Sequence, residues 1–171
     1  MPQVFSRKRI TAFLSDIGRW MAVTTGALSA TFLAGTFCVV MLGVISRYVV
    51  RSPLQWTEEM ARFLMLWTGF TAINVAMYHR QHLAIDAVII LLPQRVVKIL
   101  GYISDILIAY FLIILLDKGY AMTTRTIMKA SSIEISMFWI YGAVPLGALL
   151  TLMQHLLQVF IKLLEPSELQ T

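Results

Sequence analysis

The sequence predicts an all-α integral membrane protein with four transmembrane helices and a short interfacial helix between the second and third spans. Hydrophobic residues make up 58% of the 171 residues and charged residues 13%, whereas soluble domains average about 45–50% and about 25%. The mean hydropathy is +0.77. Two runs, 21–46 and 135–161, contain no charged residue and exceed the ~20 residues that cross a bilayer. These figures exclude a soluble domain, a disordered chain and a free-standing nucleic-acid binder, and they favour one membrane domain over 1–171.

The first span is predicted at 21–46. Its apolar run is too long for a signal peptide, and no small-residue cleavage site follows it. The net charge of +5 fits basic membrane flanks, and the cluster Arg7, Lys8 and Arg9 precedes the span. Basic residues favour the cytoplasmic side, and four spans return the chain to its starting side. Both termini are therefore predicted to be cytoplasmic.

The second span is predicted at 60–78. Ser52 and Gln55 have the spacing of a capping box, with Pro53 at the first helical position, so the helix should begin before the membrane. Glu58 and Glu59 then fall in its early turns, where the helix dipole favours acidic side chains.

The segment 80–92 contains Asp86 and an apolar part too short to cross a bilayer. We expect an interfacial helix there. The third span is predicted at 99–116, with the helix continuing toward Thr126.

The fourth span is predicted at 135–161. A second capping box, Ser131 to Glu134, precedes it. Pro145 lies inside the span and should kink the helix or loosen one turn, because proline lacks the backbone donor and its ring meets the carbonyl four residues earlier.

Helices in lipid associate through small residues that allow close backbone approach. Rows of such residues recur at steps of four, and they are candidate packing seams against this bundle or against another subunit: Ala22, Gly26, Ala30 and Ala34; Thr68, Ala72 and Ala76; and Ala143 and Gly147.

Asp105 lies well inside an apolar span, where an unpaired carboxylate costs at least ~2.5 kcal/mol. It should therefore find a hydrogen bond, a cation or a proton. A structural bond, a contact with a partner subunit and an ion-coupling site all remain open. Asn74 is expected to bond between helices.

The densest group of charges lies between the first two spans. Glu58 and Arg62 are spaced as an i, i+4 helix pair, which leaves Glu59 to reach another arginine or a partner. The group is either a solvated network at the membrane edge or a docking surface for a protein. With Asp105, the predicted partner-interface residues are Arg47, Arg51, Trp56, Glu58, Glu59 and Arg62.

No catalytic, metal or cofactor site is predicted. No nucleophile or activating histidine accompanies the acids, and Walker, GxGxxG, HExxH and GxSxG motifs are absent from the sequence. A haem-bearing anchor would need facing histidines at similar depth, and His155 lies deeper than His79.

The stretch from Arg47 to Pro93 resembles the DctQ family, the small membrane subunit of tripartite ATP-independent periplasmic (TRAP) transporters. The matching residues are Arg47-Tyr48, Ser52 to Glu59, Ala61-Arg62, Trp67, His82, Ile85-Asp86 and Leu92-Pro93, with Tyr141, Pro145 and Gly147 in the fourth span. A fusion to the large subunit, common in the family, is not seen in this sequence.

The resemblance implies a scaffold role in the bacterial inner membrane. Family members brace a large elevator-type membrane subunit, a periplasmic binding protein delivers the substrate, and sodium drives uptake of sialic acid or C4-dicarboxylates. The implied partners are these two proteins and membrane lipid, with no nucleic acid. Two alternatives stay open, a stand-alone four-span transporter and a haem-bearing anchor subunit.

Overall fold

The computed structural model describes residues 2–79, 94–126 and 136–164. These residues form helices α1 (Pro2–Tyr48), α2 (Trp56–Tyr78), α4 (Gln94–Arg125), α5 (Met137–Tyr141) and α6 (Ala143–Leu164). Four stretches are long and apolar enough to cross a membrane: Thr11–Tyr48, Trp56–Tyr78, Ile99–Arg125 and Met137–Leu164. The predicted all-α fold with four spans is confirmed. The predicted interfacial helix at 80–92 and the Ser131–Glu134 capping box lie outside the described residues.

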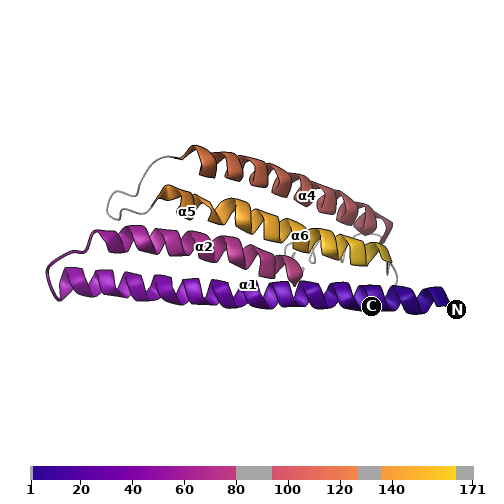
Figure 1. Cartoon of the computed structure of the whole chain (residues 1–171), viewed down its shortest axis with the longest axis horizontal. Coiled ribbons are helices and arrows are strands. Elements are labelled where there is room, and N and C mark those ends of the chain that lie inside the picture. Colours follow the sequence, from indigo (N-terminus) through magenta and orange to yellow (C-terminus); the bar gives the residue numbers. More distant parts are fainter. Residues whose placement is uncertain (1, 80–93, 127–135, 165–171) are drawn as a thin grey trace.

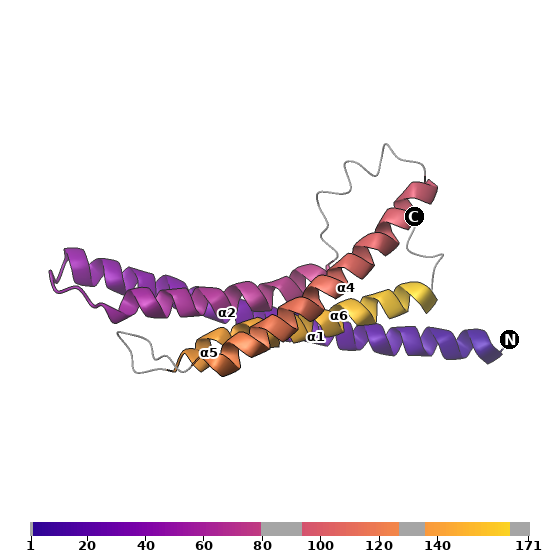
Figure 2. The same ribbon diagram turned by 90° about the horizontal axis from the view of Figure 1, so that it is seen from above.

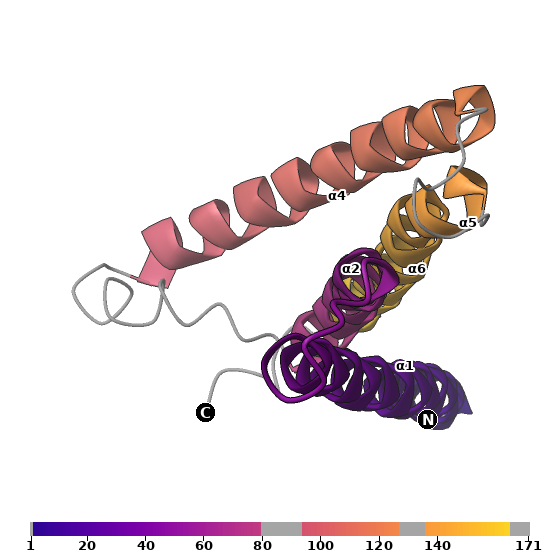
Figure 3. The same cartoon turned by 90° about the vertical axis from the view of Figure 1, so that its left-hand side faces the viewer.

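The helices lie side by side in the order α1, α2, α6 and α4 (Figure 1). α1 packs on α2 and α6, whereas α4 packs mainly on α5 and α6. Viewed from above, α4 crosses obliquely over α6 (Figure 2). The end view shows α4 ending beside α5 and diverging from α6 toward its first residues (Figure 3). The start of α1 and the end of α6 lie at the same end of the bundle. α6 packs on α1, α2 and α4, so it joins α4 to the other helices.

The predicted capping box at Ser52 to Gln55 is wrong. α2 begins at Trp56, and Gln55 precedes it without a side-chain cap bond. The hydroxyl of Ser46, buried at the end of α1, instead donates to the carbonyl of Ser52 (2.6 Å) and accepts from the amide of Leu54 (3.1 Å). These tertiary bonds tie the loop to α1, and Arg51 turns the chain with φ of 57°.

The line of α1 that faces the bundle alternates steps of three and four, the spacing of left-handed coiled coils. Ser29 Oγ on this line donates to the carbonyl of Thr68 (3.2 Å), and the rings of Phe32 and Trp67 lie 5.7 Å apart. Its members are buried or half-buried, and most are small or polar: Thr11, Gly18, Ala22, Thr25, Ser29, Phe32, Thr36, Val39, Gly43 and Ser46.

The predicted small-residue rows face the bundle only in part. Four residues advance about 40° more than one turn, so a step-of-four row drifts off a straight contact line. Ala22 and Gly147 are buried, and Gly26 and Ala72 are half-buried, whereas three row members are exposed: Ala30, Ala34 and Ala76. For those three, packing against another subunit stays a prediction.

The fourth span is interrupted between α5 and α6 at Gly142. Proline disrupts the bond to the carbonyl four residues earlier, which for Pro145 is that of Tyr141, the last residue of α5. The predicted loosening at Pro145 is therefore confirmed. A Cβ on Gly119 of α4 would lie 2.9 Å from Val144 Cγ1, so α4 approaches closely at this break.

Polar side chains hold the described helices together. Asn74, fully buried, donates from Nδ2 to Thr25 Oγ1 (2.9 Å), as predicted for an interhelical bond. Gln158 Nε2 donates to the carbonyls of Met77 and Tyr78 (2.9 Å each) at the end of α2. Such bonds replace the hydrophobic effect, which does not drive helices together in lipid.

Candidate partner-docking site

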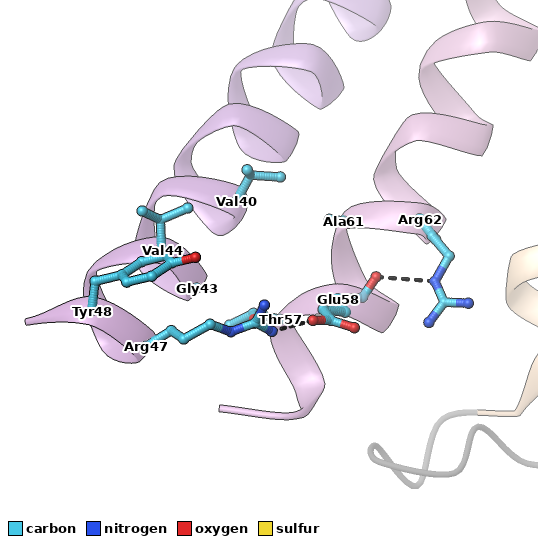
Figure 4. Close-up of a pocket in the computed structure, with 9 residues that line it drawn as sticks. All are labelled: Val40, Gly43, Val44, Arg47, Tyr48, Thr57, Glu58, Ala61 and Arg62. Atoms are coloured by element: carbon cyan, nitrogen blue, oxygen red, sulfur yellow. Dashed lines mark hydrogen bonds and ion pairs between the residues drawn. The ribbon is translucent and has the colours of Figure 1, made fainter. Parts of the chain in front are cut away.

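The charged site lies where α1 ends and α2 begins. Arg47, in the last turn of α1, forms an ion pair with the carboxylate of Glu58 in the first turns of α2. Arg62 Nε donates to the backbone carbonyl of Glu58 (3.3 Å). Figure 4 shows the two guanidinium groups on either side of Glu58. The predicted pairing of the Glu58 and Arg62 side chains is thus wrong, because Arg47 from the neighbouring helix takes the carboxylate.

The backbone beneath these charges is held by short local bonds. Thr57 is buried, and its hydroxyl donates to the carbonyl of Leu54 (2.7 Å). A Cβ on Gly43 would lie 2.8 Å from Thr57 Oγ1, so α1 and α2 can approach closely here because residue 43 has no side chain. Glu58, the residue after Thr57, is therefore held at a defined distance from α1.

Two hollows surround the Arg47–Glu58 pair. The larger, about 540 Å³, runs between α1 and α2 and is lined by Val40, Gly43, Val44, Arg47, Tyr48, Thr57, Glu58, Ala61 and Arg62. The smaller, about 300 Å³, lies toward the loop and is lined by Arg47, Pro53, Leu54, Gln55, Glu58, Glu59 and Arg62. Arg47, Glu58 and Arg62 belong to both hollows, so the charges lie between a loop-facing hollow and a span-facing one.

The paired side chains are accessible: Arg47 is 55% exposed and Glu58 62%. Exposed ion pairs contribute about 0–1 kcal/mol to stability. The pair therefore orients charge at the surface more than it stabilises the fold. An accessible, oriented group of both signs suits recognition of a charged partner.

The structure brings four of the predicted interface residues together: Arg47, Glu58, Glu59 and Arg62. Arg51 is exposed in the loop, and Trp56 is half-buried at the first turn of α2. Neither lines the two hollows.

Asp105 lies apart from this group, on α4. Its Oδ2 is 2.6 Å from Lys162 Nζ on α6, and the side chains are 23% and 29% exposed. Lys162 also lies over the ring of Tyr102 (5.0 Å). Lys162 is a partner that sequence reasoning missed. The available signal was a lone lysine ending the fourth span, on the side of the bundle where the third span begins.

The histidines in the described part of the chain lie in different surroundings. A ring nitrogen of buried His155 lies 2.9 Å from the carbonyl oxygen of Asp105, whereas His79 is exposed at the end of α2. Within residues 2–79, 94–126 and 136–164, no three His, Cys, Asp or Glu residues are grouped to hold a metal ion.

The comparison with known families settles the class of protein. A sequence model described as "Tripartite ATP-independent periplasmic transporters, DctQ component" matches residues 36–165. The chain belongs to the DctQ family. The match includes the end of α1, the charged site and all of α2, α4, α5 and α6. This DctQ-family chain is accordingly a multi-pass membrane subunit of a transporter and not an enzyme.

Three relatives resemble the DctQ-family chain. The sialic acid TRAP transporter permease protein SiaT of Haemophilus influenzae (strain 86-028NP) is 26% identical over 130 residues, 75% of this chain and 21% of SiaT. A putative TRAP transporter small permease protein of H. influenzae (strain ATCC 51907 / DSM 11121 / KW20 / Rd) is 34% identical over 89 residues, 51% of this chain and 55% of the relative. The isethionate TRAP transporter permease protein DctMQ of Oleidesulfovibrio alaskensis is 39% identical over 51 residues, 30% of this chain and 8% of DctMQ. The chain thus spans about a fifth of SiaT and about half of the small permease protein.

Proposed function

We propose that this chain is the small permease subunit of a TRAP transporter that braces a large elevator-type membrane subunit. The complex takes up an organic acid, either sialic acid or a C4-dicarboxylate. A periplasmic binding protein delivers the acid, and a sodium gradient drives its uptake. The chain forms one membrane domain over 1–171 in the bacterial inner membrane, with both termini cytoplasmic.

The observation that carries this proposal is the accessible charged site at the end of α1 and α2, in a chain that belongs to the DctQ family. The loop-facing hollow presents Arg47, Glu58, Glu59 and Arg62 where the first span ends and the second begins, beside the loop that joins them, where a soluble partner reaches them. A scaffold needs such a surface, whereas a conduit needs a midplane site built from broken helices.

The core of the described helices supports a static role. Transport sites in membranes use polar groups that face a water-filled path. Here buried Asn74 and half-buried Gln158 bond to neighbouring helices, so they hold the bundle together. The size of the fused relatives supports a large partner: SiaT extends far beyond the part that matches this chain.

Sialic acid is our first candidate substrate, since the relative that covers most of this chain is named for it. The membrane subunits are reconstituted in liposomes with and without this chain, and the binding protein is added outside. Uptake of sialic acid, succinate and isethionate is followed with and without a sodium gradient. We expect sodium-dependent uptake of one acid from the complete system, and none from this chain alone.

Uptake by the isolated chain would refute the scaffold role and favour a stand-alone transporter. A Soret band in the purified chain would favour the haem-bearing anchor. Full uptake by the large subunit and binding protein without this chain would also contradict the bracing role.

A further inference from the structure

The span-facing hollow of about 540 Å³ has two chemically different parts. Its wall consists of small apolar residues from both helices: Val40, Gly43, Val44 and Ala61. Its rim carries charge and one aromatic ring: Arg47, Tyr48, Glu58 and Arg62. We call this hollow the α1–α2 groove. An apolar wall below a charged rim matches an amphiphile rather than a soluble ion.

The groove lies at the edge of a predicted membrane span. Val40 to Tyr48 are the last residues of the span Thr11–Tyr48, and eight helical steps cover ~12 Å. The wall therefore lies in the last turns of this apolar stretch, next to the loop that joins α1 and α2. Val40 and Val44 are 44% and 45% exposed, so no other described helix covers them.

The rim has one net positive charge, from two guanidinium groups and one carboxylate. Arg47 is paired with Glu58, and Arg62 uses Nε for the Glu58 carbonyl. A guanidinium group has five donors, so further donors remain on both arginines for an oxyanion. Paired donors of arginine bind phosphate oxygens with well-defined geometry.

We infer that the α1–α2 groove binds an anionic phospholipid from the leaflet at the Tyr48 end of the bundle. Its phosphodiester accepts hydrogen bonds from Arg62 and Arg47, and one acyl chain lies along Val40, Val44 and Ala61. This inference rests on the chain spanning a membrane and stands whether or not the proposed transport partners are correct.

The test uses the full-length chain in detergent, titrated with dioleoyl phosphatidylglycerol and followed by native mass spectrometry. Two variants address the two parts of the groove. Arg62→Gln removes rim charge, and Ala61→Phe fills the apolar wall without changing charge. Arg51→Gln is the matched control, because Arg51 is exposed in the loop between α1 and α2 but lines neither hollow.

We expect one tightly retained lipid in the parent chain and in Arg51→Gln. The apparent dissociation constant should rise about tenfold in Arg62→Gln, as one charge-assisted contact is lost. A comparable rise is expected in Ala61→Phe. Glycerophosphoglycerol, which has the phosphodiester headgroup but no acyl chain, should bind far more weakly. Circular dichroism and gel filtration identify any variant that misfolds, and Gly43 is left unchanged because α1 and α2 are in close contact there.

Three results would overturn the inference. The parent chain could retain no phosphatidylglycerol. Glycerophosphoglycerol could bind as tightly as the lipid. Folded Arg62→Gln and Ala61→Phe variants could retain lipid normally yet fail to associate with the large subunit, which would make the groove a protein interface.

Discussion

Asp105 on α4 and Lys162 on α6 form an ion pair with 2.6 Å between Oδ2 and Nζ. α4 packs mainly on α5 and α6, so this contact fastens the outermost helix of the bundle. Neutralising each charge with the other allows both to lie within or near a membrane span, where isolated charges are costly. His155 adds a bond to the Asp105 carbonyl (2.9 Å).

Removing one charge of this pair should destabilise the chain more than removing both charges. Lys162→Met leaves Asp105 unpaired. Because the side chains are 23% and 29% exposed, we expect a loss of about 1–3 kcal/mol, below the value for a fully buried pair. The double variant Asp105→Asn with Lys162→Met should recover most of it. Thermal unfolding in detergent gives the double-mutant cycle. Additive losses would show that the two charges are not coupled.

Gly147 is predicted to tolerate no side chain. A Cβ there would lie 2.6 Å from Phe70 Cβ and 3.0 Å from the Phe70 carbonyl oxygen. Gly147→Ala should therefore cost about 1–3 kcal/mol through overpacking of α2 against α6. Gly69→Ala is the matched control, since a Cβ at that position would have nothing within 4 Å, and alanine favours helix. Equal melting temperatures for both variants would contradict the close approach.

Two glutamines one turn apart on α6 should respond in opposite directions. Gln154 is buried, and neither of its amide atoms has a hydrogen-bond partner among the described residues. Gln154→Leu should be neutral or stabilise the fold by about 1 kcal/mol. Gln158→Leu removes a donor that serves two carbonyls and should cost about 1 kcal/mol. Unfolding in detergent measures both, and destabilisation by Gln154→Leu would refute the prediction.

Charge reversal in the docking site should separate transport from folding. We expect Glu59→Lys to reduce uptake by the complete system severalfold while expression stays near that of the parent chain, because like charges then oppose the partner. Glu58→Ala or Arg62→Ala alone should change stability by less than about 1 kcal/mol. Arg125→Glu, exposed at the end of α4, is the control. Parallel loss of expression and uptake in Glu59→Lys would mean that the charges are merely structural.

The sequence alone was sufficient for the class and number of the long helices. Hydropathy over 21–46 and 135–161 depends only on the residues of each stretch. A stretch that crosses lipid must also satisfy its backbone hydrogen bonds within itself, so it forms a helix whatever its neighbours are. The loosening caused by Pro145 is equally local, since a proline acts on the carbonyl four residues before it. α1 begins at Pro2, well before the apolar run at 21–46, because a helix can continue beyond its apolar part.

Only the tertiary structure decided which groups meet. Glu58 has a favourably spaced arginine on its own helix, yet Arg47 of α1 takes its carboxylate. Ser52 has the spacing of a capping residue, yet Ser46 of α1 bonds to the loop. The sequence specifies no partner for Asp105, whereas the packing of α6 on α4 places Lys162 beside it. Spacing along one helix specifies only that helix's own faces, whereas these partners depend on how neighbouring helices are shifted and rotated when their small residues pack.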